Sequence, residues 1–430
     1  MAVTRRQFLI GAGLAAAATG GLTACGSDSG GGGEGGATNM AFAWWGNAVR
    51  NENTSKAIAA YMAANPGLTI EGQPGEFASY WDKLATQTAG NTAPDIIQMD
   101  MNYIAEYGSR GALLDLEANG GDVSKFAEGT VDSGKIDGKL VGINAGINSL
   151  CILAAPDIFE KAKMDLPDDQ TWTWDELKEI SAEVVSKAGM TAGIAGLFTT
   201  DGPLGTFVRQ NGKELFTPDG LAFEAADAQA WFDLMMDFQK AKAIGSAENV
   251  SEEATKPLDQ NAIAVGTSAM QLSNSNQLEA FTAAAGKELA ILRLPSLTGK
   301  ATERKAWYKA SQLFSASART KNPEAAVKFI NWLVNSPESA NINLAERGIP
   351  ANTEMLALVE PKLSEPQQAV AKFIADIEPE LATTPIAPPP GGGTIALVLV
   401  RYCTDVLFGR STSADAGTKF VEELKSNLTV

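Results

Sequence analysis

The apolar stretch Asn39-Met40-Ala41-Phe42-Ala43-Trp44 lies between a glycine-rich segment and Gly46-Asn47. A run of this length between glycines predicts a buried β-strand. Elements of alternating type follow it: a helix that contains Ala57, Ile58, Tyr61 and Met62 and stops at Asn65-Pro66-Gly67, a strand over Leu68–Glu71, a helix over Tyr80–Ala89 and a strand over Asp95–Met99. Strands that alternate with helices of this kind predict an α/β fold with a parallel sheet and right-handed crossovers.

The remainder of the chain predicts one long crossing strand and four amphipathic helices. A turn at Asp137–Gly142 leads into extended sequence that continues through Leu153, long enough to pass from one lobe to another. Apolar residues recur at helical spacing in Trp174–Lys187, with Thr173 as the N-cap, in Trp231–Ala243, in Pro323–Leu333, and in a last helix from Ile395 to the glycine stop at Gly409. A chain of 430 residues exceeds the roughly 100 to 200 residues of one domain, so two lobes with separate cores are expected.

Residues 1–24 predict an export leader that ends at a lipid attachment site. The basic head Thr4-Arg5-Arg6-Gln7-Phe8-Leu9 precedes a Gly- and Ala-rich apolar run that is too short for a membrane helix. Paired arginines in this position are typical of twin-arginine export. Leu22-Thr23-Ala24-Cys25 resembles the bacterial lipobox, which implies a mature chain that begins at a lipidated Cys25, held at the outer face of a membrane by a tether over residues 25–38. The alternative is a chance cysteine after an ordinary secretory signal.

Composition excludes several classes of function. The formal charge is −17 and becomes −19 when Arg5 and Arg6 leave with the leader; so acidic a chain does not favour nucleic acid or anionic lipid as partners. The chain has no histidine, which removes Ser-His and Cys-His nucleophile pairs and zinc sites built on imidazole. Paired carboxylates are the catalytic chemistry that stays open.

Neither a cofactor nor a metal site is predicted. Gly129–Ile136 has P-loop spacing, but Ile136 stands where a Ser or Thr must reach the magnesium, and no strand precedes it. Cys151 and Cys403 lie in apolar stretches, where two buried free thiols are favoured over a disulfide.

Polar and aromatic residues follow the predicted strands at the edge where ligands bind in parallel sheets. Trp45 and Asn47 follow the first strand, and Asp100 and Asn102 follow the third. An indole beside amides and a carboxylate suits a polyhydroxy ligand, because the ring covers its C–H face while the polar groups meet its hydroxyls. Stacking over about 100 Å² contributes about 2.5 kcal/mol, whereas micromolar binding needs about 8 kcal/mol, so several hydrogen bonds are required. Alternation turns one of Trp44 and Trp45 inward; we place Trp45 in the cleft, with core packing as the alternative.

The order of short motifs along the mature chain resembles bacterial extracellular solute-binding protein family 1, the sugar receptors of ABC importers that include the maltose-binding proteins. The motifs are Tyr80-Trp81-Asp82-Lys83-Leu84, Pro94-Asp95-Ile96-Ile97, Gly138-Lys139-Leu140-Val141-Gly142, Thr173-Trp174-Asp175-Glu176-Leu177, Ser268-Ala269-Met270, Leu294-Pro295, Asn322-Pro323-Glu324-Ala325-Ala326 and Gly348-Ile349-Pro350. The resemblance implies a two-lobe, periplasmic-binding-protein-like fold of type II with a hinge and a ligand cleft. It also implies discontinuous lobes: residues 39–146 and 312–354 in lobe 1, and residues 147–311 and 355–430 in lobe 2.

The resemblance carries candidate ligand contacts onto individual positions. Trp45, Asn47, Asp100 and Asn102 match the strand-end loops of lobe 1, Asn148 matches the crossing strand, and Asp201 matches a lobe 2 loop; Ser273, Asn274 and Asn276 lie where maltose-type receptors place a tryptophan that this chain lacks. Residues Gly391–Gly393 replace an aromatic of those receptors, which puts a long stacked maltodextrin in doubt. Trp307 and Arg347 are further candidates, with packing or a surface ion pair as the alternative.

These features together predict a lipid-anchored, extracytoplasmic receptor rather than an enzyme. It is expected to act as a monomer, to bind a sugar or short oligosaccharide between its lobes, and to deliver it to the permease subunits of an ABC transporter. Two alternatives stay open at this point. One is an exported carbohydrate-active enzyme that uses paired carboxylates; the other is the same fold with a polyol, peptide or phosphorylated ligand.

Overall fold

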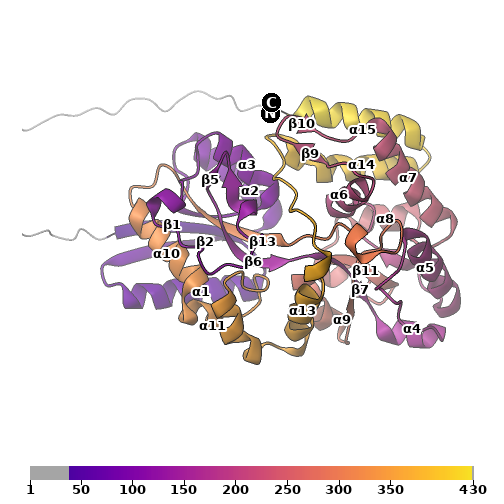
Figure 1. The fold of residues 1–430 in the computed structure, drawn as a ribbon, viewed down its shortest axis with the longest axis horizontal. Coiled ribbons are helices and arrows are strands. Elements are labelled where there is room, and N and C mark those ends of the chain that lie inside the picture. Colours follow the sequence, from indigo (N-terminus) through magenta and orange to yellow (C-terminus); the bar gives the residue numbers. More distant parts are fainter. Residues whose placement is uncertain (1–37, 429–430) are drawn as a thin grey trace, which may run out of the picture. The chain divides into compact units, whose positions relative to one another are not determined.

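The strand predicted at Asn39 lies inside a five-stranded sheet. The computed structural model describes residues 38–428. Figure 1 shows that the sheet lies in the half of the molecule where the described chain begins. The strands follow the order β2 (Leu68–Gly75), β1 (Thr38–Trp45), β3 (Ile96–Met99), β13 (Lys309–Ala316) and β6 (Ile143–Asn148). As predicted, β1 pairs in parallel with both β2 and β3.

Helices cover both faces of this sheet, so the two faces of β1 are both buried. Phe42 and Trp44 pack into one cluster with α1 (Ala48–Ala64) and α10 (Pro323–Asn335). Ala43 and Trp45 pack on the other side with α2 (Phe77–Ala89) and α3 (Met101–Ser109). The expectation that one of the two tryptophans turns outward is therefore wrong: Trp44 is 1% exposed and Trp45 is 8% exposed. Strands of a doubly covered sheet are apolar on both faces, which the continuous run at residues 39–45 already reflects.

A second sheet of four strands lies in the other half. Its order is β12 (Ala290–Leu292), β7 (Leu150–Ala154), β11 (Ser268–Asn274) and β8 (Ala192–Ala195). The chain passes from one sheet to the other where β6 ends and β7 begins, with Ser149 between them. This is the predicted crossing, and strand structure is interrupted at that residue.

Each sheet contains one strand that runs against its neighbours. β13 is antiparallel to β3 and β6, and β7 is antiparallel to β11 and β12. Both sheets are thus mixed, although β1, β2 and β3, from which a parallel sheet was predicted, do pair in parallel. The reason is topological: the chain enters β7 and β13 from the other sheet, so each strand starts at the edge where its neighbours end.

The helices are distributed around the two sheets. Those associated with the first sheet are α1 (Ala48–Ala64), α2 (Phe77–Ala89), α3 (Met101–Ser109), α10 (Pro323–Asn335) and α11 (Pro337–Asn343). The others are α4 (Pro156–Ala162), α5 (Trp174–Ala188), α6 (Asp201–Gln210), α7 (Ala225–Lys240), α8 (Ala247–Glu253), α9 (Leu278–Ala285), α12 (Thr353–Val359), α13 (Glu365–Asp376), α14 (Ile395–Leu407) and α15 (Ser413–Asn427). Two short hairpins, β4–β5 (Lys135–Ile136, Lys139–Leu140) and β9–β10 (Phe216–Thr217, Gly220–Leu221), complete the fold.

The four predicted helices are present, with two differences. Thr173 caps α5 as predicted, because its side chain accepts from the Glu176 N–H while the Glu176 carboxylate accepts from the Thr173 N–H. The helix predicted from Trp231 begins earlier, at Ala225. The helix that ends before Gly409 is not the last, since α15 follows it and packs its Phe420 and Leu424 into the core.

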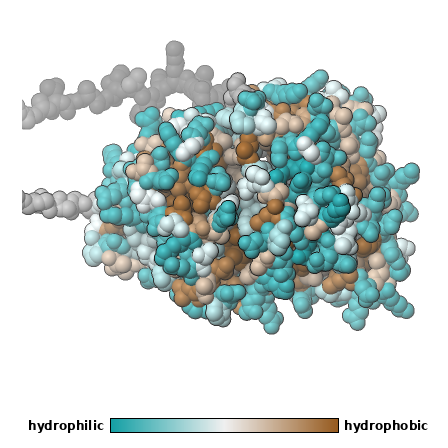
Figure 2. Space-filling model, viewed as in Figure 1, coloured by the Kyte–Doolittle hydropathy of each residue, from teal (hydrophilic) through white to brown (hydrophobic). Residues whose placement is uncertain are grey.

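Other sequence predictions have simple outcomes. The leader, Cys25 and all of the tether except Thr38 lie outside the described residues. Cys151 and Cys403 are buried free thiols, as favoured, and burial raises the pKa of both well above the usual range. No helix between residues 38 and 428 is both long and apolar enough to cross a membrane. The face in Figure 2 is mainly hydrophilic, with smaller hydrophobic areas between polar side chains.

Candidate functional site

A cavity of about 240 Å³ lies where the ends of elements from both sheets meet. Its walls come from the start of α3, the start of β7, the first turns of α6, the end of β11, the start of β13 and a proline-rich loop. The lining residues are Met101, Asn102, Leu150, Thr200, Asp201, Gly202, Gly205, Arg209, Glu214, Leu215, Phe216, Leu272, Ser273, Asn274, Gln277, Trp307, Lys309, Pro385, Ile386 and Pro388. Five of the predicted contacts, namely Asn102, Asp201, Ser273, Asn274 and Trp307, are therefore brought together here.

Two opposite charges face this cavity without pairing directly. Asp201 is the first residue of α6, and Lys309 is the first residue of β13. No hydrogen bond or ion pair of the Lys309 side chain occurs within the described residues, although its charge acts on Asp201. Burial raises the pKa of Asp201, and the negative charge of Asp100 adds to this, while Lys309 opposes it. A ligand hydroxyl can donate to the carboxylate and accept from the ammonium in such a site.

Trp307 supplies the aromatic wall of the cavity. The guanidinium carbon of Arg209 lies 5.4 Å from the centre of the indole ring. Arg209 is fixed in turn, because its Nε donates to Glu214 Oε1 at 3.0 Å and its Nη1 donates to the Lys305 carbonyl at 3.3 Å. These contacts hold the buried guanidinium of Arg209 beside the indole ring.

The turn after β11 contributes amide and hydroxyl groups. Ser273 Oγ lies 3.0 Å from Gln277 Oε1, to which it donates. The side-chain oxygen of Asn274 is buried and has no hydrogen-bond partner in the described part of the chain. A buried acceptor without a partner is costly, so a donor from a bound ligand would stabilise it.

Asn148 and Asn276 pair with each other beside the cavity rather than lining it. Asn148 Nδ2 donates to Asn276 Oδ1 at 2.9 Å, which links the end of β6 to the turn after β11. The Asn148 side-chain oxygen is buried and unpaired among the described residues. This contact joins the two halves of the molecule near the crossing.

The residues predicted at the ends of β1 and β3 are used mainly to start helices. Asn47 caps α1 by accepting from the Arg50 N–H at 2.9 Å, and Asp100 caps α3 by accepting from the Asn102 N–H at 2.9 Å. Neither side chain lines the cavity, although the Asp100 charge reaches Asp201. A polar residue at the end of a strand can either cap a helix or contact a ligand, because both roles use the same residue types.

Trp45 packs against three aromatic rings instead of lining the cavity. Its ring centre lies 5.5 Å from that of Phe77, 5.1 Å from Tyr80 and 5.3 Å from Trp81. Truncation of Trp45 would open a cavity in this aromatic cluster. Its ligand contact stays a prediction.

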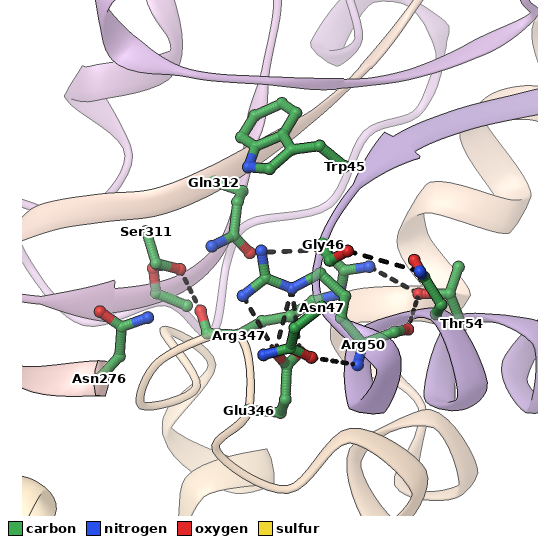
Figure 3. A network of polar contacts seen from close by, with 12 residues as sticks. Trp45, Gly46, Asn47, Arg50, Thr54, Asn276, Ser311, Gln312, Glu346 and Arg347 are labelled. Atoms are coloured by element: carbon green, nitrogen blue, oxygen red, sulfur yellow. Dashed lines mark hydrogen bonds and ion pairs between the residues drawn. The ribbon is translucent and has the colours of Figure 1, made fainter. Parts of the chain in front are cut away.

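Arg347 is buried and links α1 to two strands of the first sheet. Figure 3 shows it inside a network of polar contacts: Nη2 donates to Thr54 Oγ1 at 2.7 Å, and Nη1 donates to Gln98 Oε1 and, at 3.4 Å, to Gln312 Oε1. Burial lowers its pKa to about 9, and Arg50 adds to this, so the side chain still carries its charge at neutral pH. These contacts give Arg347 the packing role that the sequence left as its alternative.

Several residues that line the cavity were not predicted from the sequence. Arg209 and Lys309 are the main omissions among the charged residues, together with the proline-rich loop at Pro385–Pro388. Lys309 stands two residues from Trp307 at the start of an apolar strand, which is a usable signal. Arg209 gives no such signal, because only folding of α6 brings it under the indole.

Comparisons with known proteins agree with this architecture. A family model described as bacterial extracellular solute-binding protein matches residues 56–371. A maltooligosaccharide ABC transporter solute-binding lipoprotein of Streptococcus pneumoniae is 23% identical over 332 residues, which is 75% of this chain and 75% of that protein. The structure of an extracellular solute-binding protein family 1 member from Alicyclobacillus acidocaldarius is 25% identical, covers 91% of this chain and 98% of that chain, and has a TM-score of 0.68. The structure of a periplasmic oligogalacturonide-binding protein of Yersinia enterocolitica is 18% identical, covers 91% of this chain and 100% of that chain, and has a TM-score of 0.79. This likeness concerns the fold alone.

Two α/β lobes that meet at a shared cavity define a type II, two-lobe binding protein. The family match covers most of the chain, and the chain belongs to the bacterial extracellular solute-binding proteins. The predicted family resemblance and fold class are confirmed. Because proteins of this family bind solutes for transport, the prediction of a receptor rather than an enzyme is confirmed as well.

Proposed function

We propose that this chain is the sugar-binding subunit of an ABC importer and that the cavity beside Trp307 holds the sugar. The observation that carries the proposal is the lining itself: the aromatic rings of Trp307 and Phe216 line the same space as the polar residues Asp201, Lys309, Asn102 and Asn274. Aromatic and aliphatic side chains can cover the C–H groups of a polyhydroxy ligand, and the amides and opposite charges among them can meet its hydroxyls. The naming of a streptococcal relative for maltooligosaccharide transport supports the same ligand class.

The two lobes would close over the ligand. We propose the boundaries expected from the sequence, residues 39–146 and 312–354 for lobe 1 and 147–311 and 355–430 for lobe 2. In the first sheet β6 continues to Asn148 and β13 begins at Lys309, so the chain crosses between the sheets two to three residues outside these bounds of lobe 1. The bond between Asn148 and Asn276 then links the first sheet to the turn after β11, which supports a hinge in this region. Contacts from both lobes to one ligand would stabilise the closed state, which the permease would then recognise.

The leader and anchor belong to the same proposal. Export by the twin-arginine route, cleavage before Cys25 and lipidation of that cysteine would hold the receptor as a monomer beside its permease. The name of the streptococcal relative as a lipoprotein supports the anchor. A chain folded before export, in a reducing compartment, would also keep Cys151 and Cys403 unpaired.

Native mass spectrometry of protein purified without added ligand tests the ligand class. We expect a retained mass that matches a mono- or oligosaccharide and that is released intact when the protein is denatured. A retained peptide, polyol or phosphorylated compound would assign the cavity to another solute and contradict the sugar proposal. Substitution of Asp201 by Asn serves as the control, because it should reduce retention of a genuine cavity ligand.

A further inference from the structure

Residues 383–390, Thr-Thr-Pro-Ile-Ala-Pro-Pro-Pro, form a segment that we call the strap. The strap has no helix or strand structure and leads from the region after α13 toward α14. In Figure 1 it is part of the yellow-orange coil that runs between the two halves of the molecule. Three of its side chains, Pro385, Ile386 and Pro388, line the cavity.

The strap is fixed at its first end beside the aromatic wall. The Thr383 carbonyl accepts a hydrogen bond from Arg209 Nη2, the same guanidinium that lies against Trp307. The preceding residue, Ala382, donates its N–H to the Ala306 carbonyl at 2.7 Å. The strap therefore begins at a defined position next to the indole.

The other end of the strap leads into a tight turn that packs closely against Phe216 and α3. Gly392 donates its N–H to the Pro389 carbonyl at 2.8 Å, and a Cβ added at Gly392 would lie 3.2 Å from the Phe216 ring. At Gly393 an added Cβ would lie 2.6 Å from the Asn102 carbonyl oxygen, so the chain touches α3 of lobe 1 there. Glycine is needed at this approach because a side chain would not fit.

The middle of the strap touches lobe 1 as well. Ala387 packs against the cluster that contains Trp45 and Trp81, while the next residue, Pro388, is buried against the cavity. Ile386 is 45% exposed although it lines the cavity. An apolar side chain at this edge offers no hydrogen bond to a further sugar unit, and proline at several strap positions limits how far the backbone can move.

We infer that the strap closes one end of the binding site and restricts it to a short saccharide, with Ile386 as the residue that sets the limit. The inference rests on the proposed sugar-binding function and deepens it. The cavity volume of about 240 Å³ lies below the range of about 300 to 1,000 Å³ that is usual for ligand pockets. A short saccharide fills a space of this size, and a longer chain would have to pass the strap.

Calorimetric titration of the native protein with saccharides of increasing length tests the inference. The probes are glucose and the α-1,4-glucans from maltose to maltohexaose, and galacturonic acid with its di- to hexasaccharides. We expect the mono- or disaccharide of the bound series to bind at least about tenfold more tightly than the hexasaccharide. Equal or tighter binding of the hexasaccharide would overturn the inference while leaving the sugar-binding function in place.

A matched pair of variants sharpens the result. Ile386→Ala should reduce the ratio of the affinities for short and long ligands several-fold. The long ligand should bind more tightly, and the affinity for the short ligand should change little. Val265→Ala, a similarly exposed aliphatic residue that does not line the cavity, should leave the profile unchanged. An unchanged profile in Ile386→Ala would contradict the role of Ile386. Failure of every saccharide to bind the native protein would contradict the proposed function and, with it, this inference.

Discussion

At the scale of single residues, Lys309 and Asp201 define the chemistry of the cavity. Both line it: Lys309 begins β13 of the first sheet and Asp201 begins helix α6. The two side chains form no direct ion pair within the described residues. Carboxylates were expected from the sequence at strand and helix ends, whereas the lysine was not. A hydroxyl placed between the two groups gains two charge-assisted hydrogen bonds.

Replacement of Lys309 by Met should weaken saccharide binding by about tenfold to a hundredfold. A hydrogen bond to a charged group is worth about 1.5 to 3 kcal/mol, which corresponds to this range. Calorimetry of the variant against the native protein measures the effect, with Lys321→Met as the control because Lys321 is exposed and does not line the cavity. Equal affinities of Lys309→Met and the native protein would exclude a ligand contact at this position.

Saccharide binding should also depend on pH through Asp201. Because its pKa is raised, Asp201 takes up a proton at a higher pH than an ordinary aspartate, whose pKa is about 3.9. Affinity should therefore fall as the pH decreases through a window that starts above that value. Without ligand the sign is opposite: the protonated form is favoured by folding, so Asp201 lowers stability as pH rises through the raised pKa.

Titrations of native protein and Asp201→Asn over the same pH series measure this dependence. The variant should bind more weakly at neutral pH and show a flatter profile. In Lys309→Met the fall in saccharide affinity should begin at higher pH, because the lysine charge lowers the pKa of Asp201 in the native protein. A pH profile that is identical in native protein and Asp201→Asn would rule out Asp201 as the titrating acceptor.

At the scale of elements, the first sheet could be predicted well and the site only in part. The apolar runs at β1, β2 and β3 and the helices between them follow from periodicity alone. The reversed strands β7 and β13 could not be predicted in this way, because their direction depends on where the chain crosses between sheets. The same holds for Arg209, Lys309 and the strap, which reach the cavity through long-range folding.

Trp45 illustrates this difference between a strand-end residue and a ligand contact. We expect Trp45→Ala to lower the free energy of unfolding by about 3 to 5 kcal/mol, since it removes a large ring from a buried aromatic cluster. Chemical denaturation measures the loss, and Trp45→Phe should lose less because it keeps a ring. Unchanged stability together with weaker saccharide binding would instead favour the ligand contact predicted from the sequence.

Arg347 links α1, β3 and β13 through Thr54, Gln98 and Gln312. Arg347→Ala should lower the free energy of unfolding by about 2 to 5 kcal/mol, because buried polar groups lose their partner. The exposed Arg319→Ala should change it by less than about 0.5 kcal/mol. If Arg347→Ala kept native stability and lost saccharide binding, Arg347 would have to be reassigned from packing to the ligand site.

At the scale of the whole molecule, the two sheets are joined by a chain crossing at Ser149 and share one cavity, in which we propose that the ligand binds. The family membership follows from the match over residues 56–371, and the sugar is the part that we propose. Closure would bring Asp201 and Trp307 onto a ligand that already contacts Asn102 in the other lobe. The strap adds a wall that touches both lobes and limits the length of that ligand.

Calorimetric titration of the native protein with a panel of mono- and oligosaccharides is the most direct test of the central claim. We predict saturable binding of at least one short saccharide at one site per chain, with a dissociation constant on the order of micromolar or below. The same ligand should bind Lys309→Met and Asp201→Asn more weakly. Absence of binding across the whole panel would contradict the assignment of this receptor to a sugar.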